Sequence, residues 1–290
     1  LLNNFNLSDP IMDSQQEAKI INDIEDKQAY KSTYPVLTGK SEEGALHELH
    51  VFLLPLNPEQ SVVDRCLQVT DLYNQERGAE LNGYPMKMCY LTLLFRTAGP
   101  VKVLQSARYL RSNDQDEVVR EIYKDAEFFR KHGFDVVRIK IEANAHASKG
   151  IPLTDEEAGT HPKYFEFHVK VAHKSKKDDV AISKEEEEEL AEISKKFTQE
   201  FKAPIPLSWN NLANAGNHEN PGYQRFLNIR FRNTGFKNCS ENLTKLHKAI
   251  NDNTPFKVVK SIDEYVWFDT FTPMDHGWID FKPGDEVPTQ

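Results

Sequence analysis

The sequence predicts an α+β protein formed by tandem duplication of ferredoxin-like halves, of the split βαβ type, that share a polar cleft. Strand-like and amphipathic helical segments alternate along the 290-residue chain, and a similar order of elements occurs on both sides of a turn-rich linker. A Glu-x-His pattern begins each half, at Glu48–His50 and at Glu166–His168. The expected divisions are an N-terminal arm over 1–44, a first α/β repeat over 45–145, a linker over 146–162, and a second α/β repeat with a C-terminal closing segment over 163–290.

The first half begins after a polar arm in which Gln15–Asp26 is expected to form one short helix. Pro55 marks the end of the first strand, and Gly78 and Gly133 stand where two amphipathic helices are expected to stop. The expected elements are a strand over 48–56, a helix over 57–78, a strand over 86–99, an extra strand within 100–114, a helix over 115–134 and a strand over 135–143.

The second half follows the linker with a similar order. Its glutamate-rich segment is expected to be helical, because Ser183 and Glu186 form a capping-box pattern and early carboxylates favour the helix dipole. Residues 206–222 are expected to be a loop-like insertion. The expected elements are a strand over 164–171, a helix over 183–201, a strand over 225–235, a helix over 239–251, and two strands over 256–259 and 264–270.

Short sequence matches support duplication. "LLFRTAG" at 93–99 resembles "NIRFRNTG" at 228–235, which pairs Arg96 with Arg232. "VVRIKIEA" at 136–143 lies where "VVKSIDEYVW" lies at 258–267. The alternative to duplication is that any two α/β halves share an alternation of strands and helices.

Composition narrows the class of protein. The formal net charge of −9 argues against general attraction to nucleic acid or to anionic membranes, although a local basic cleft stays open. Nucleic-acid binding by that cleft also stays open, but no aromatic ladder or basic arm supports it. No apolar run approaches the roughly 20 residues that span a bilayer. Three widely separated cysteines favour a reducing compartment, so a cytoplasmic protein without a membrane partner is expected.

Polar side chains gather on one face of the predicted strands, since residues two apart on a strand share a face. A solvated sheet face is the ordinary explanation, but two histidines among several arginines and lysines favour a concave basic site that attracts a small anionic ligand. On the last strand, either Glu264 or the set Tyr265, Trp267 and Asp269 joins this face, depending on register. The other members are Glu48, His50, Thr92, Arg96, Arg138, Lys140, Glu142, Glu166, His168, Lys170, Asn228, Arg230 and Arg232.

Paired acid–base catalysis is the first functional hypothesis. His50 and His168 are the expected catalytic pair, oriented by Glu48 and Glu166. An anionic substrate is expected to bind Arg96, Arg138, Lys140, Lys170, Arg230 and Arg232.

This arrangement resembles the 2H phosphoesterase superfamily, in architecture and in His50 and His168, over residues 48–269. The resemblance implies hydrolysis or transfer at a phosphate ester of a small anionic or nucleotide-like substrate, without a cofactor. The family's motif has Thr or Ser two residues after each histidine, whereas this chain has Phe52 and Lys170.

Two other classes stay open. Glu48, His50, Glu166 and His168 form a two-His, two-carboxylate set for a divalent metal, in the manner of enzymes that resemble the vicinal oxygen chelate family. The third class is a non-catalytic domain that binds an anionic ligand or a partner protein. Loop histidines and a closing turn are weaker candidates; they are His146, His161, His218, Asp275, His276 and Trp278.

Overall fold

The computed structural model describes residues 37–81, 83–95, 99–159, 163–175, 182–212 and 224–270. Several expectations fall outside these ranges. They are the arm helix at 15–26, Arg96, His161, His218 and the closing turn with Asp275, His276 and Trp278.

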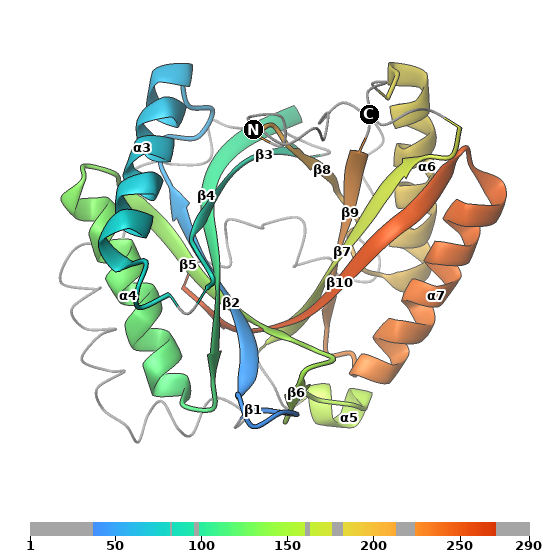
Figure 1. The fold of residues 1–290 in the computed structure, drawn as a ribbon. Coiled ribbons are helices and arrows are strands. Elements are labelled where there is room, and N and C mark those ends of the chain that lie inside the picture. Colours follow the sequence, from blue (N-terminus) through green and yellow to red (C-terminus); the bar gives the residue numbers. More distant parts are fainter. Residues whose placement is uncertain are drawn as a thin grey trace.

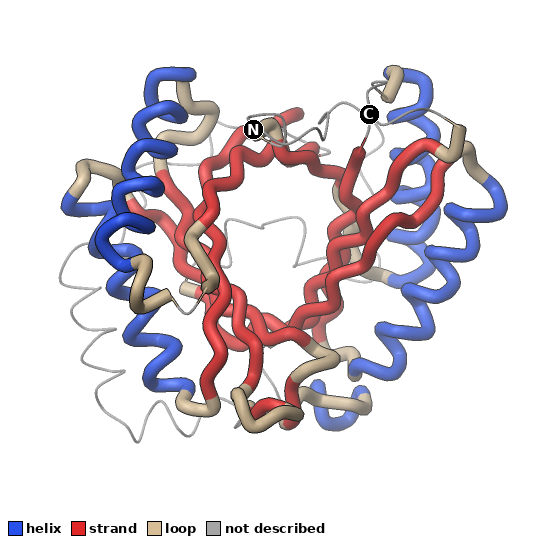
Figure 2. The backbone as a smooth tube through the Cα atoms, in the orientation of Figure 1, coloured by secondary structure: helices blue, strands red, loops and turns tan. Residues whose placement is uncertain are grey.

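Eight antiparallel strands form a closed barrel, and the long helices lie on its outside (Figures 1 and 2). The first half supplies β2 (Ala45–Leu53), α3 (Gln60–Arg77), β3 (Lys87–Phe95), β4 (Gly99–Ser112), α4 (Gln115–Lys131) and β5 (Val136–Asn144). The second supplies β7 (Tyr164–His173), α6 (Lys184–Phe201), β8 (Leu207–Asn210), β9 (Gln224–Arg232), α7 (Phe236–Asn253) and β10 (Phe256–Asp269). The short elements are β1 (Thr38–Gly39), which pairs with β6 (Ser148–Lys149), and α5 (Asp155–Ala158).

The order around the barrel is β10-β5-β2-β4-β3-β8-β9-β7, and β10 also pairs with β7. The strands of each half are therefore contiguous, and the halves meet where β3 pairs with β8 and where β5 pairs with β10. The α+β class is confirmed. The expected cleft between two halves is instead the interior of one barrel, because pairing at both junctions leaves neither half with an open sheet edge.

Two expected boundaries were wrong in the second half. The segment 206–222, which was expected to be a loop-like insertion, contains the strand β8. Because β8 has only four residues and turn-forming residues follow it, the sequence pattern does not reveal it. The two expected last strands are one strand, β10, which continues through the polar stretch 260–264 because it pairs with β7. As a result, Arg96 follows the second strand of its half, whereas Arg232 ends the third, so these two arginines do not correspond.

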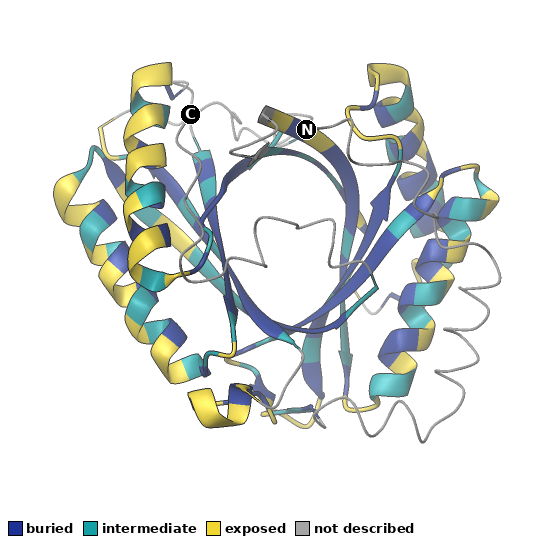
Figure 3. Ribbon diagram, turned by 180° about the vertical axis from the view of Figure 1, so that it is seen from behind, coloured by how far each residue is buried: buried dark blue, intermediate teal, exposed yellow. Residues whose placement is uncertain are grey.

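The apolar core lies between the outer barrel face and the helices, as Figure 3 shows for the buried sides of both helix pairs. Asp114 caps α4 by accepting hydrogen bonds from the backbone N–H groups of Asp116 and Glu117. Ser183 and Glu186 form the expected capping box of α6. Among the helices of the described ranges, none combines the length and apolar character that a membrane crossing needs.

A buried ion pair ties α4 to the barrel. Arg108 of β4 donates from Nε to Asp125 Oδ2 at 2.6 Å and from Nη2 to Glu121 at 3.1 Å. Tyr73 and Arg77 of α3 also contact Asp125, so both helices depend on this carboxylate. Removing one partner of a buried pair leaves the other charge uncompensated.

We expect Arg108→Met to lower the free energy of unfolding by about 3–5 kcal/mol, because Asp125 stays buried without its closest cation. Urea denaturation followed by circular dichroism measures the loss. Arg120→Ala is the matched control, since its ion pair with Asp114 is exposed and contributes about 0–1 kcal/mol. Equal losses in the two variants would show that the buried pair is not important for stability.

Candidate functional site

The barrel interior contains a cluster of charged side chains, because the alternation of each strand sends one face inward. Register places carboxylates directly opposite one another: Glu48 of β2 pairs with Glu142 of β5, and Glu166 of β7 pairs with Glu264 of β10. Like charges in such positions are destabilising unless other groups compensate them. The interior cluster, as named below, comprises Glu48, His50, Lys140, Glu142, Glu166, His168, Arg230 and Glu264.

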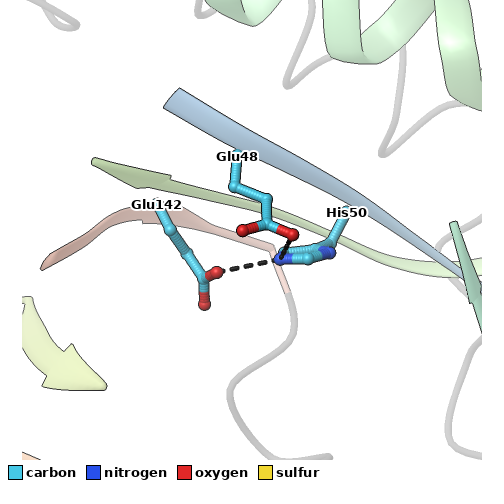
Figure 4. Close-up of side chains that lie close together, drawn as sticks. All are labelled: Glu48, His50 and Glu142. Carbon is cyan, nitrogen blue, oxygen red and sulfur yellow. Dashed lines mark hydrogen bonds and ion pairs between the residues drawn. The ribbon is translucent and has the colours of Figure 1, made fainter. Parts of the chain in front are cut away.

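His50 lies between two of these carboxylates (Figure 4). Its Nε2 is 2.8 Å from Glu142 Oε2 and 3.8 Å from Glu48 Oε1. Its Nδ1 lies 2.6 Å from the side-chain amide nitrogen of Gln105, which fixes the ring from the opposite side. One ligand atom from each of Glu48, His50 and Glu142 lies within 4.8 Å of the others, the spacing of a metal-binding triad.

His168 forms a second triad of the same kind with Glu142 and Glu264. Its Nε2 is 3.5 Å from Glu166 Oε1 and 3.6 Å from Glu264 Oε2. Its Nδ1 lies 2.6 Å from Asn228 Oδ1, and the amide nitrogen of Asn228 donates to Ser208 Oγ. The two triads share Glu142, so the structure brings the predicted histidines to one carboxylate that the sequence prediction had not assigned.

Lys140 and Arg230 neutralise part of this charge. The Lys140 ammonium is 2.5 Å from Glu142 Oε1 and 3.0 Å from Glu166 Oε2, while Arg230 Nη2 donates to Glu166 Oε1 at 2.7 Å. Glu166, an expected metal ligand in the alternative hypothesis, is therefore held by two cations. Glu142 and Glu264 complete the two triads in its place.

Burial and neighbouring charges shift the pKa values of this cluster in opposite directions. Burial, with the charges of Glu142 and Glu48, raises the pKa of Glu264 well above its ordinary value. Burial disfavours a charged imidazole, but Glu142 and Glu48 outweigh it and raise the pKa of His50. Burial likewise opposes ionisation of Glu142, yet Lys140 and His50 hold the pKa of that carboxyl well below its ordinary value.

The other basic residues expected to bind an anion have separate surroundings. Arg138 forms a bidentate ion pair with Asp269 at 2.9 and 2.7 Å, and Tyr164 donates to the same carboxylate. The Lys170 ammonium lies 6.0 Å from the ring centroid of Phe226, and the Arg232 guanidinium lies 5.6 Å from that of Tyr164.

Sequence reasoning missed the roles of Glu142 and Glu264. Alternation alone places Glu142 on the inward face, but the order of strands around the barrel is needed to bring it beside His50. The sequence did not decide whether Glu264 points to the polar face, because the register of the last strand was unknown. The pairing of Glu264 with Glu166 resolves that register and turns Glu264 inward.

Comparisons with known proteins show only distant similarity. No family model matches the sequence, and no curated protein matches it. A heme-binding protein from Thermus thermophilus is 12% identical, with a TM-score of 0.26, over 81% of this chain and 95% of that one. An aldoxime dehydratase is 9% identical, with a TM-score of 0.35, over 81% and 89%. A putative chlorite dismutase is 12% identical, with a TM-score of 0.23, over 77% and 94%.

The phosphoesterase prediction is corrected. None of these three structures is described as a phosphoesterase, and their TM-scores assign neither family nor ligand to this chain. The physical reason lies in the interior, where Arg138, Lys140 and Arg230 already pair with carboxylates instead of forming a phosphate site. The expectations of hydrolase activity and of phosphate binding depended on that prediction and are corrected with it. The expectation of no cofactor is withdrawn too, because the interior presents two triads of side chains that could hold a metal ion.

We expect Glu264→Gln to stabilise the metal-free protein increasingly as the pH rises above 4.5. A group whose pKa is raised by folding favours the folded state fully below its unfolded pKa, and loses that contribution as the pH rises through its folded pKa. The folded protein therefore keeps a proton on Glu264 that the unfolded chain releases above pH 4.5, the ordinary value. The difference from the native chain should grow by about 1.4 kcal/mol per pH unit.

Urea denaturation between pH 5 and 8, in the presence of a chelator, measures that difference. Glu189→Gln, an exposed position on α6, is the control and should show no such trend. A pH-independent effect of Glu264→Gln would contradict the raised pKa of Glu264.

Proposed function

We propose that the barrel interior is a metal centre in which Glu48, His50 and Glu142 bind one divalent transition-metal ion. The observation that carries this proposal is the first triad, whose three ligand atoms from two paired strands already lie within 4.8 Å of one another. It differs from the four-ligand set expected from the sequence, because Glu142 takes the place of Glu166 and His168 belongs to the second triad.

Charge balance supports a divalent ion. Within the interior cluster, four carboxylates accompany two permanent cations, Lys140 and Arg230, which leaves two negative charges when both histidines are neutral. Buried charge without compensation is costly. One divalent ion neutralises this excess, and without it the raised pKa values of His50 and Glu264 favour retention of protons.

The donor set also favours a first-row ion such as zinc, iron or manganese, which accept imidazole and carboxylate ligands together. Gln105 holds the far nitrogen of His50, as outer contacts of metal ligands commonly do. A metal ion bound here supplies Lewis-acid activation of a small ligand.

A heme does not fit the same histidines. An axial ligand needs an imidazole nitrogen directed at the iron. In this chain both nitrogens of His50 have partners, and Nε2 of His168 faces the carboxylates of Glu166 and Glu264. A heme is therefore not part of the proposal.

The proposed ligand of the metal centre is a small anion. His168 is the most exposed side chain of the two triads, at 25%, which makes its side of the cluster the approach for a ligand. Lys170 follows His168 along the inward face of β7, and Arg232 lies opposite Tyr164 at the start of that strand. These two cations flank the cluster along the barrel and favour a negatively charged ligand.

We also infer that the halves arose by duplication, with the first repeat over 45–145 and the second over 163–290, joined by a linker. Both halves follow the order strand, helix, strand, strand, helix, strand. Their strand orders, β5-β2-β4-β3 and β10-β7-β9-β8, are equivalent and of ferredoxin type. Each Glu-x-His pattern lies on the first strand of its half.

Metal binding tests the proposal. We expect the chelator-treated chain to take up one Zn²⁺ per molecule in isothermal titration calorimetry, and Glu142→Gln and His50→Ala each to weaken binding at least tenfold. His146→Ala is the matched control, because its ring is exposed and pairs with Asp263 outside the barrel cluster. Native-like circular dichroism establishes folding of each variant. No uptake by the native chain, or equal uptake by all variants, would overturn the metal centre.

A further inference from the structure

Lys140 occupies a position that resembles a second metal site. Its ammonium lies between Glu142 Oε1 and Glu166 Oε2, at 2.5 and 3.0 Å, and its side chain is buried. Glu142 therefore directs one oxygen to His50 and the other to a fixed cation. Its two oxygens serve two neighbouring positive groups, as a carboxylate between two metal ions does.

The second triad also uses Glu142. His168 and Glu264 complete it, and Glu166 Oε1 is 3.5 Å from His168 Nε2. Asn228 orients the imidazole by contacting its Nδ1, so Nε2 faces the carboxylates. Two histidines, each in a triad with the shared Glu142, form a donor set for two ions.

We propose that Lys140 is the resident cation of this second position, and that it determines that the native chain binds one metal ion instead of two. This inference rests on the proposed metal centre. With one divalent ion and both permanent cations, the four carboxylates are neutralised. A second divalent ion would add two positive charges beside a buried ammonium, and Coulomb repulsion in a low-dielectric interior opposes that.

The test is the metal stoichiometry of Lys140→Met. This change removes the charge and leaves a flexible apolar chain of similar length. We expect Lys140→Met to bind two Zn²⁺ per chain in equilibrium dialysis, where the native chain binds one. In electron paramagnetic resonance, Mn²⁺-loaded Lys140→Met should show the spectrum of a coupled pair, whereas the native chain shows isolated Mn²⁺.

Lys257→Met is the control. It removes the same charge from an exposed position on the barrel strand β10, where no ligand is assigned, and should keep a stoichiometry of one. Lys140→Gln guards against misfolding, because its amide can still donate hydrogen bonds to Glu142 and Glu166 without the charge, and it should also bind two ions through the second triad.

The outcomes separate the two proposals. If the native chain binds no Zn²⁺, the metal centre itself is wrong. If the native chain binds one ion and both folded Lys140 variants also bind one, the metal centre stands and the role of Lys140 is overturned.

Discussion

The contact between Glu142 and Lys140 is the interaction on which the interior depends. A closed barrel of eight strands must fill its centre, and here the centre holds carboxylates that register brings into direct opposition. Lys140 bridges the two halves of the chain by contacting Glu142 on its own strand and Glu166 on β7. Without that bridge, two buried negative charges would destabilise the arrangement of strands that carries both histidines.

The same interaction explains why Lys140 and Arg230, although basic, do not form a phosphate site. Arginines and lysines on alternating strand positions indicate positive charge only while their partners are unknown. Glu142 and Glu166 take up Lys140, Glu166 also takes up Arg230, and Asp269 takes up Arg138. The excess charge of the interior cluster is negative, which favours the proposed metal ion at its centre over a directly bound phosphate.

Much of the fold could be predicted from local signals, because capping, periodicity and glycine stops are local properties. Asp114 and Ser183 cap their helices, and apolar alternation defined β2, β5 and β7. Barrel closure depends on pairing between segments far apart in the chain, which alternation does not specify. β8 has only four residues, and β10 contains a register shift between Val258 and Lys260, so both were misjudged. The candidate site shows the same limit. His50 and His168 were found from a pattern, whereas the role of Glu142 requires knowing which strand lies beside β2.

The position of β10 in the barrel has a consequence for biosynthesis. It is the last barrel strand to leave the ribosome, yet it pairs with β5 of the first half as well as with β7. Until β10 emerges, β5 has an unpaired edge and the glutamates of the first half are open to water. Closure therefore requires β10, and the nascent first half must avoid edge-to-edge association until that strand has emerged. Strand pairing between distant segments is slow, and a chaperone that binds the unpaired strands would protect the chain during this step.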